Sequence, residues 1–371
     1  MISSGGDTTM KSKEHLRFTI SPFLVFILIH AMQFGPEYVS MSTKPIQLAG
    51  QDSWISVILC GISFHIIIWM MYRILNRNET DLIQIHKRFF GKLLGGGLNF
   101  IFIGYFLLIA TYLLRMFIEI IQVWLFPDLN TWPLALVLLL LVYYIVAGGF
   151  RVIVGICMFS MLRYITILSL FFPSTFYHFS NLSPVLDHSL NEIVQASTTL
   201  TFPYLGVEVL LFCYTFIRMP KKSEKWAHLA NGITTASYLI IIFFSLLLFK
   251  PEQLSTEIWP QLSKYKFVHF PFIERFEYIG ATSQILWVIP IICLSLWASS
   301  RVCKLIFSVK QLTVLPILLI VVFILVCLIP GRTRIEALQN LLSEIGFYMI
   351  YAYIPFVFIV DVVRMKVRRT V

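Results

Sequence analysis

The chain of 371 residues is 58% hydrophobic and only 13% charged, with a mean hydropathy of +0.82. Soluble domains are closer to half apolar and a quarter charged, so this composition excludes a soluble protein and indicates a polytopic membrane protein. A net charge of +10 would suggest nucleic-acid binding in a soluble protein. Here the basic residues follow the membrane topology instead, and we expect a lipid bilayer and no nucleic acid as partner.

Apolar stretches long enough to cross a bilayer recur along the whole chain. A crossing helix needs about 20 predominantly apolar residues. The sequence predicts an all-α protein, a single transmembrane domain over residues 1–371 with ten such helices. They lie near residues 18–38, 54–73, 95–126, 132–148, 152–176, 195–217, 230–249, 280–300, 312–330 and 345–363.

Lysine and arginine are distributed unevenly between the segments that join these helices. With the N-terminus inside, the inner segments carry 20 of the 29 basic residues and the outer segments carry 7, while Arg115 and Arg163 lie within spans. Because inner segments are enriched in Lys and Arg, both termini are predicted to be cytoplasmic. These are the N-terminal segment 1–17 and the tail 364–371.

Two of the apolar stretches contain residues that interrupt a regular helix. In the first, Gln33, Phe34, Gly35 and Pro36 stand where an apolar helix should continue. Pro36 has no amide proton to donate, and Gly35 accepts dihedral angles that other residues do not. The sixth stretch is interrupted in the same way over 201–208, TFPYLGVE. Lipid cannot satisfy the backbone groups that a break frees, so protein or a polar ligand must surround each one.

Ten crossings divide into two five-helix repeats, 18–176 and 195–363. An odd number of helices in each half gives the halves opposite orientations, so breaks in the first and sixth helices would face each other. Such paired interruptions point to a binding site near the membrane midplane of an inverted-repeat transporter. Two tolerated proline kinks are the alternative.

Three segments outside the spans are expected to be ordered. Thr80–Lys92 combines apolar and basic residues, which suits a short interfacial helix, with a solvated basic turn as the alternative. The aromatic-rich outer loop 251–279 is expected to form a lid. A short helix over Asp187–Gln195 would lead into the sixth span.

Ionisable residues within the spans need partners or a cavity because burying them in lipid is costly. Glu208 follows the second break, where it would bind an ammonium group, carry a proton or form an ion pair that locks the helix. Arg115 and Glu119, four residues apart, are expected to pair or to form a gate. Arg163 would pair with Glu119, Glu208 or Asp361, and Asp361 is expected near the inner interface.

Other polar and aromatic residues on the spans have two interpretations each. His30 and His65 are expected to be hydrogen-bonded between helices, with a proton relay as the alternative. Four aromatic side chains are candidates for lining a cavity, with packing as the alternative: Tyr105, Tyr112, Trp287 and Tyr348.

The sequence contains no motif for a cofactor, a metal or catalysis. None of its six cysteines forms a CxxC pair, and neither a phosphate-binding loop nor a dinucleotide fingerprint occurs. We therefore expect no cofactor, no metal site and no enzymatic activity.

Three stretches carry a resemblance to a known family: Gly50–Ile55 (GQDSWI), Phe202–Glu208 (FPYLGVE) and Phe272–Phe276 (FIERF). In these, and in its length, ten spans and inside termini, the chain resembles the B subunits of Ger-type spore germinant receptors. Those are permease-like proteins of the amino acid–polyamine–organocation superfamily. The resemblance implies a LeuT-like fold, the inner membrane of the spore, assembly with an A subunit and a lipoprotein C subunit, and recognition of a small nutrient, commonly an amino acid.

The two breaks are the predicted ligand-binding site. Exposed helix N-termini bind carboxylates and unwound carbonyls bind ammonium groups, so broken helices can hold an amino acid zwitterion. The candidate residues are Gln33, Phe34, Gly35, Pro36, Thr201, Phe202, Tyr204, Gly206, Glu208, Tyr105 and Trp287.

Two functions fit this site. The first is a nutrient-sensing receptor subunit with a transporter fold, and the second is an amino-acid permease driven by protons or sodium. A membrane enzyme would need an acid, base or nucleophile cluster at one membrane face. An ion or water conduit would need polar residues along several spans. The sequence offers neither pattern.

Overall fold

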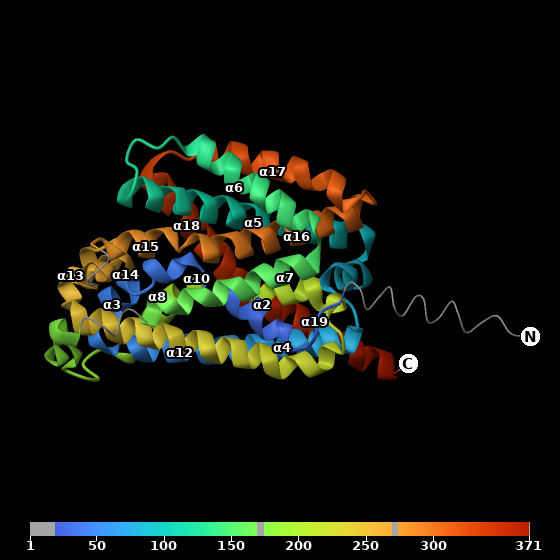
Figure 1. Cartoon of the computed structure of the whole chain (residues 1–371). Coiled ribbons are helices and arrows are strands. Elements are labelled where there is room, and N and C mark those ends of the chain that lie inside the picture. Colours follow the sequence, from blue (N-terminus) through green and yellow to red (C-terminus); the bar gives the residue numbers. More distant parts are fainter. Residues whose placement is uncertain (1–18, 169–173, 269–273, 371) are drawn as a thin grey trace, which may run out of the picture.

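The computed structural model describes residues 19–168, 174–268 and 274–370, and these ranges fold almost entirely as helices. Most helices run along the length of the molecule, and the described part of the chain begins and ends at the same end of it (Figure 1). No strand forms in the described ranges apart from an isolated bridge between Ile20 and Ile217. The predicted cytoplasmic segment 1–17 lies outside the described residues.

Eighteen α-helices have defined bounds in this part of the chain, and short 3-10 turns join several of them. The helices are α2 Leu24–Gln33, α3 Thr43–Ala49, α4 Ser53–Asn78, α5 Leu82–Trp124, α6 Thr131–Ala147, α7 Phe150–Phe159, α8 Tyr164–Leu168, α9 Leu190–Thr199, α10 Thr201–Tyr204, α11 Leu210–Cys213, α12 Glu224–Leu248, α13 Pro251–Thr256, α14 Pro260–Lys264, α15 Phe276–Thr282, α16 Ile285–Phe307, α17 Gln311–Leu328, α18 Gly331–Tyr348 and α19 Ile354–Thr370.

The helices support a multi-pass membrane protein. In the described part of the chain, six helices are long and apolar enough to cross a membrane. The pair Leu190–Thr199 and Thr201–Phe216, bent by 48°, would make a seventh span, and α2 and α6 are shorter apolar helices. The predicted all-α membrane class is therefore confirmed, whereas the count of ten spans and the two five-helix repeats stay predictions.

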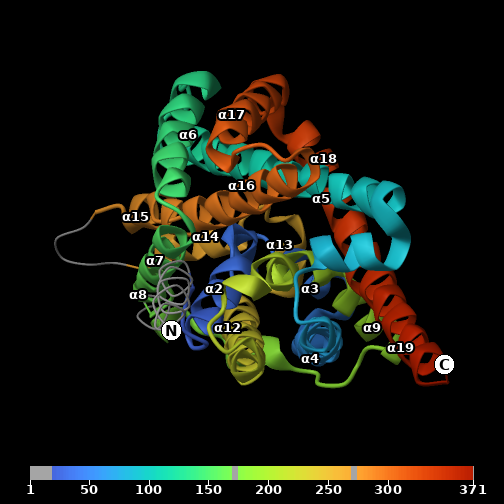
Figure 2. The same cartoon turned by 90° about the vertical axis from the view of Figure 1, so that its right-hand side faces the viewer.

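Helix α2 lies in the interior of the bundle (Figure 2). It packs against α7, α12 and α16, and eight of its ten residues are buried. A helix that is apolar on all sides is stable only when it is surrounded. The first helix break, at the end of α2, is therefore also buried inside the protein.

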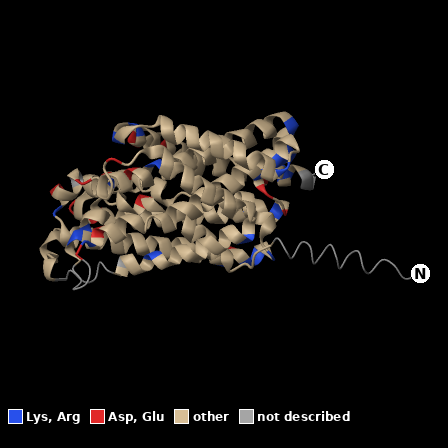
Figure 3. Ribbon diagram, turned by 45° about the horizontal axis from the view of Figure 1, so that its top comes forward, with Lys and Arg blue, Asp and Glu red and all other residues tan. Residues whose placement is uncertain are grey.

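Charged residues lie mostly toward the two ends of the molecule, and few of them lie between (Figure 3). The long helix α5 has one non-helical residue, Gly91, whose φ of +79° is a conformation that glycine adopts at little cost. This kink separates Leu82–Phe90 from the rest of α5. The buried residues of the separated segment include Leu82 and Ile83. The helix expected over Thr80–Lys92 therefore forms, and its position at a membrane interface stays a prediction.

The other two connecting segments are also ordered. Helix α9 begins with a capping box in which Ser189 and Glu192 exchange hydrogen bonds, so the helix predicted over Asp187–Gln195 starts at Leu190. The outer loop 251–279 contains α13, α14 and the start of α15. Residues 269–273 of this loop lie outside the described ranges, and its role as a lid is a proposal.

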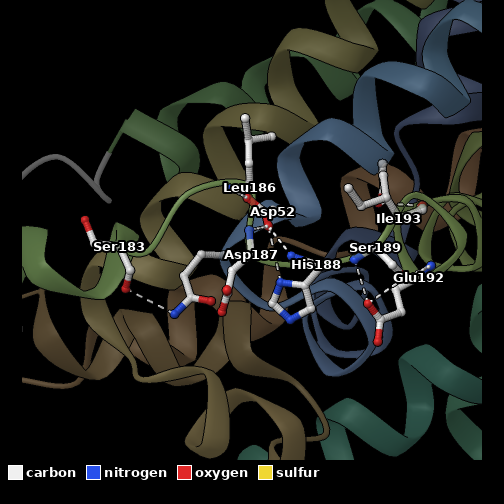
Figure 4. A network of polar contacts seen from close by, with 10 residues as sticks. Asp52, Ser183, Leu186, Asp187, His188, Ser189, Glu192 and Ile193 are labelled. Carbon is white, nitrogen blue, oxygen red and sulfur yellow. Dashed lines mark hydrogen bonds and ion pairs between the residues drawn. The ribbon is translucent and has the colours of Figure 1, made fainter.

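The carboxylate of Asp52, directly before α4, holds the segment that leads into α9 (Figure 4). It is fully buried and accepts hydrogen bonds from three consecutive backbone N–H groups, Leu186–His188, at 2.7, 2.8 and 3.1 Å. The neighbouring Gln51 donates from its side chain to the carbonyl of Ser183 at 3.3 Å. The GQDSWI stretch thus fastens the start of α4 to a segment more than 130 residues later in the chain.

Asp52→Ala is expected to lower the free energy of unfolding by about 1–3 kcal/mol, because partly buried N–H groups lose their acceptor. The measurement is thermal unfolding of the detergent-solubilised chain, followed by tryptophan fluorescence. Asp187→Ala is the matched control, because that side chain is exposed in the same segment. Equal melting temperatures for the two variants would contradict this role of Asp52.

Candidate ligand-binding site at two helix breaks

The first break follows α2 directly. The helix ends at Gln33, Phe34 has φ −89° and ψ 67°, and Gly35 is extended at φ −91° and ψ −170°. A 3-10 turn then begins at Pro36 and continues to Val39. The chain therefore stops its α-helix within the stretch that the sequence singled out.

The second break lies between α10 and a 3-10 turn over Val207–Val209. Leu205 is extended, with ψ 158°, and Gly206 has φ +119°. A residue with a Cβ atom would be strained at this φ, so glycine is the residue that allows the chain to turn here.

The two breaks lie against each other in the interior. A Cβ atom added to Gly206 would be 2.6 Å from Cβ of Met32 and 2.8 Å from its carbonyl carbon, so the second break touches the end of α2. The hydroxyl of Tyr238, on α12, lies 2.8 Å from the carbonyl oxygen of Gln33 and 2.9 Å from that of Pro203. One side chain thus bridges the backbones of both breaks.

Side chains satisfy most of the backbone groups that the breaks set free. The side-chain amide of Gln33 donates to the backbone carbonyl of Tyr204 at 3.1 Å and to the side-chain oxygen of Asn231 at 3.1 Å. Arg163 donates to the carbonyls of Phe34 and His30. Because a protein interior offers no water to exposed backbone, such partners are what make each break tolerable.

Arg163 therefore has a different partner from those that the sequence suggested. It is completely buried, and no described carboxylate lies within ion-pair distance of it, so the expected pairing with Glu119, Glu208 or Asp361 is wrong. The guanidinium also lies 4.6 Å from the ring centre of Phe34. Two carbonyl oxygens and an aromatic face replace the counter-ion, since each carries partial negative charge.

Glu208 is held by hydrogen bonds and makes no ion pair with any described cation. One carboxylate oxygen accepts from the hydroxyl of Tyr105 at 2.8 Å, and the other accepts from the backbone N–H of Gly206 at 2.7 Å. The expected ion pair is thus wrong. The carboxylate instead fixes the glycine at the second break.

The space between the breaks is small. A cavity of about 40 Å³ lies there, enough for roughly one water molecule. Six of the eleven predicted site residues line it, together with Tyr112. The six are Gln33, Gly35, Pro36, Phe202, Gly206 and Glu208.

The other five predicted site residues surround this cavity without lining it. Phe34 and Trp287 are fully buried, and their rings pack at a tilt of 43° with centres 5.7 Å apart. The hydroxyl of Tyr204 donates to that of Thr235 at 3.0 Å. Thr201 is buried and Tyr105 contacts Glu208. Their direct contact with a ligand stays a proposal.

The predicted pair of Arg115 with Glu119 was also wrong. Arg115 donates to the carbonyl of Ile329 at 2.8 Å, while Glu119 pairs with Arg332 at 3.4 Å instead of with Arg115. Positions four apart share a helix face, but both of these side chains reach toward the segment around the start of α18. In the same way, Asp361 pairs with Arg77 of α4 at 3.1 Å.

Both membrane histidines are hydrogen-bonded between helices, as predicted. His30 contacts the hydroxyl of Thr234 at 2.8 Å and that of Tyr164 at 2.7 Å. His65 of α4 lies 2.9 Å from His228 of α12, measured between their Nδ1 atoms. Tyr348, by contrast, is exposed on the outside of the bundle and lines neither the small cavity nor the larger one described next.

Glu37 also belongs to this site, although it was not among the predicted residues. It follows Pro36 and lines both the small cavity and a larger one of about 340 Å³ beside it. Its signal was present, because an acidic residue directly after a broken apolar helix is as unusual as Glu208. We call the larger space the α3–α18 cavity, since α3, α18 and the segment Thr256–Ile258 form most of its wall.

A comparison with protein families matches residues 19–334 to the family described as spore germination protein. The chain belongs to this family. Its relative GerQB, a spore germination protein of Bacillus cereus, is 38% identical over 95% of this chain and 99% of GerQB. The resemblance suggested by the three sequence stretches is thereby confirmed, although Phe272 and Ile273 of the third stretch lie outside the described residues.

Solved structures with the same fold are transporters of the LeuT type. A sodium-coupled sialic acid symporter, solved substrate-bound and outward-open, has a TM-score of 0.64 at 11% identity and matches 91% of this chain and 80% of its own. MhsT in complex with L-phenylalanine has a TM-score of 0.54 at 14% identity, matching 88% and 87%. These identities show a shared fold alone. This spore germination protein thus has a transporter architecture.

Gly206→Ala is expected to destabilise the spore germination protein by about 2 kcal/mol or more, because the new methyl group meets the backbone of Met32 and the φ is unfavourable. Gly232→Ala is the matched control: it lies in α12 with no atom within 4 Å of an added Cβ. Thermal unfolding and membrane level of the two variants provide the test, and equal values would mean that the breaks do not pack as described.

Proposed function

We propose that this chain is the nutrient-sensing subunit of a spore germinant receptor, located in the inner membrane of the spore with both termini cytoplasmic. By resemblance to its family, it acts with an A subunit and a C subunit. It binds a small nutrient, an amino acid in our proposal, at the breaks of the first and sixth spans. The observation that carries this proposal is the buried junction of two broken helices, bridged by Tyr238 and Gln33.

The junction suits a sensor because its contacts are replaceable. The hydroxyl of Tyr238 and the amide of Gln33 join the two backbones by single hydrogen bonds, each worth about 1 kcal/mol net. A ligand with polar groups at both breaks would exchange these contacts for its own. A ligand that binds one arrangement better than another shifts the population toward it, and partner subunits would respond to the difference.

An amino-acid permease coupled to protons or sodium is the second candidate function, favoured by the sodium-coupled symporter among the fold neighbours. Arg163 argues against sodium at the first break. Unwound carbonyls are the groups that coordinate cations in such transporters. Here the carbonyls of His30 and Phe34 already accept hydrogen bonds from a permanently charged guanidinium.

For a sensor, proteoliposomes containing the chain should bind a nutrient amino acid saturably without concentrating it. Because Arg163 supplies the positive charge at the break, the dissociation constant should change less than twofold when choline replaces sodium. The measurement is equilibrium binding together with uptake of the labelled amino acid. Concentrative uptake, or tenfold tighter binding in sodium, would favour the permease.

Glu208→Gln should shift the germination dose response to nutrient concentrations roughly tenfold higher, because an amide cannot accept through both of its heavy atoms and one contact of Glu208 is lost. The measurement uses spores in which this chain belongs to the only receptor. The exposed Glu79, paired with Lys221 at the surface, gives the control Glu79→Gln. An unchanged dose response for Glu208→Gln would assign its role to packing.

A further inference from the structure

The α3–α18 cavity has no role in the function proposed so far. It lies beside the breaks and is lined by α3 and by the segment that follows α13. In Figure 1 these elements lie at the end opposite the C-terminal end of α19. Its volume of about 340 Å³ is within the range of ligand-binding pockets, whereas the space between the breaks holds about 40 Å³. In the arrangement seen here, the larger of these two cavities is the one that has room for an amino acid.

The carboxylate of Glu37 lines this cavity without forming an ion pair. Glu37 is 7% exposed, and no Lys, Arg or His among the described residues is within ion-pair distance of it. One of its oxygens accepts from Tyr112 at 3.1 Å and from Gln339 at 3.3 Å, both neutral donors. The other oxygen, Oε1, is buried with no described hydrogen-bond partner. A buried carboxylate oxygen without a hydrogen-bond donor costs free energy unless a ligand supplies that donor.

A cation without a carboxylate partner lines the same cavity. Lys44, at the start of α3, donates to the neutral side-chain oxygen of Asn340 at 3.1 Å and pairs with no described carboxylate. Arg332 also lines the cavity, but it is already bound to Glu336 at 3.0 Å and to Glu119 at 3.4 Å. Lys44 is therefore the positive group that is available to an incoming anion.

We propose that the α3–α18 cavity binds the zwitterion of an amino acid, with its ammonium group on the carboxylate of Glu37 and its carboxylate on Lys44. A ligand carrying both charges matches one unpaired acid and one unpaired base in a single cavity. Ion pairs made in such a partly enclosed space are stronger than at an open surface. This inference rests on the proposed function for the class of nutrient. The groups that recognise the two charges of the nutrient are here side chains and not backbone groups of the breaks.

Contact with Glu37 also connects this cavity to the breaks. Glu37 is the residue after Pro36, and Tyr112, which donates to it, packs edge-on against Phe202 with ring centres 5.6 Å apart. Phe202 lines both cavities. A ligand on Glu37 therefore acts on the first break through the chain itself and on the second through the Tyr112–Phe202 contact.

The test is calorimetric binding of each of the twenty proteinogenic L-amino acids to the full chain in detergent. The tightest binder is then compared with its α-amide, which lacks the carboxylate, and with its des-amino acid, which lacks the ammonium group. The wild type should prefer the amino acid to each analogue at least tenfold. Glu37→Gln should lose the preference over the des-amino acid, and Lys44→Met should lose the preference over the amide.

Controls and outcomes separate this inference from the proposed function. Glu344→Gln and Lys250→Met change exposed residues that do not line the cavity, and they should bind like the wild type. Lys44→Met changes an exposed residue and is therefore expected to fold. It tests the cavity site even if Glu37→Gln fails to fold. If both variants keep the wild-type preferences, the cavity site is wrong and the proposed function stands. If no amino acid binds the wild type, both are wrong.

Discussion

The backbone groups freed where two apolar helices stop inside the protein are the constraint on which the rest of this structure depends. Each must find a partner, because neither lipid nor a dry interior supplies one. Glu208 holds the second break from two residues away, whereas other partners come from far along the chain: Arg163 for the first break and Tyr238 across both. Burial of α2 among α7, α12 and α16 is what brings these partners within reach.

The same constraint explains how charged residues are used in the interior. Arg163 and Glu208 hydrogen-bond to backbone groups at the breaks and do not pair with each other. An arginine can satisfy two carbonyls at once because its donors form a planar fork, and a carboxylate can accept from an N–H and a hydroxyl together. Both charges therefore act as supports for irregular backbone, which is a structural role that also sets the conformation of the site.

Glu37 differs from these two residues, and the difference separates support from recognition. Arg163 and Glu208 reach the backbone groups that they hold, whereas Glu37 keeps a buried oxygen unpaired beside a cavity of about 340 Å³. The fold thus provides a junction in which side chains hold backbone groups of both breaks and, next to it, a larger space lined by charges without ion pairs. In the function that we propose, this arrangement would let a nutrient bind at the edge of the junction and alter it without being enclosed by it.

Much of the fold could be predicted from the sequence because it depends on local chemistry. The apolar runs indicate membrane helices, Gly35–Pro36 and Gly206 mark the places where helices stop, and the GQDSWI and FPYLGVE stretches indicate the family. Six of the predicted residues indeed line one small cavity. These features follow from residue type and spacing, which the chain carries without reference to its distant parts.

Only the tertiary structure decided which residues are partners. Arg115 and Glu119 share a helix face, yet neither spacing nor charge shows that the segment around the start of α18 lies nearer to both. Asp52 is one acid among many until the segment 186–188 is folded onto it. The unpaired state of Glu37 and Lys44 is likewise a property of the packed molecule. A sequence states which charges exist, but their pairing depends on distances that folding alone sets.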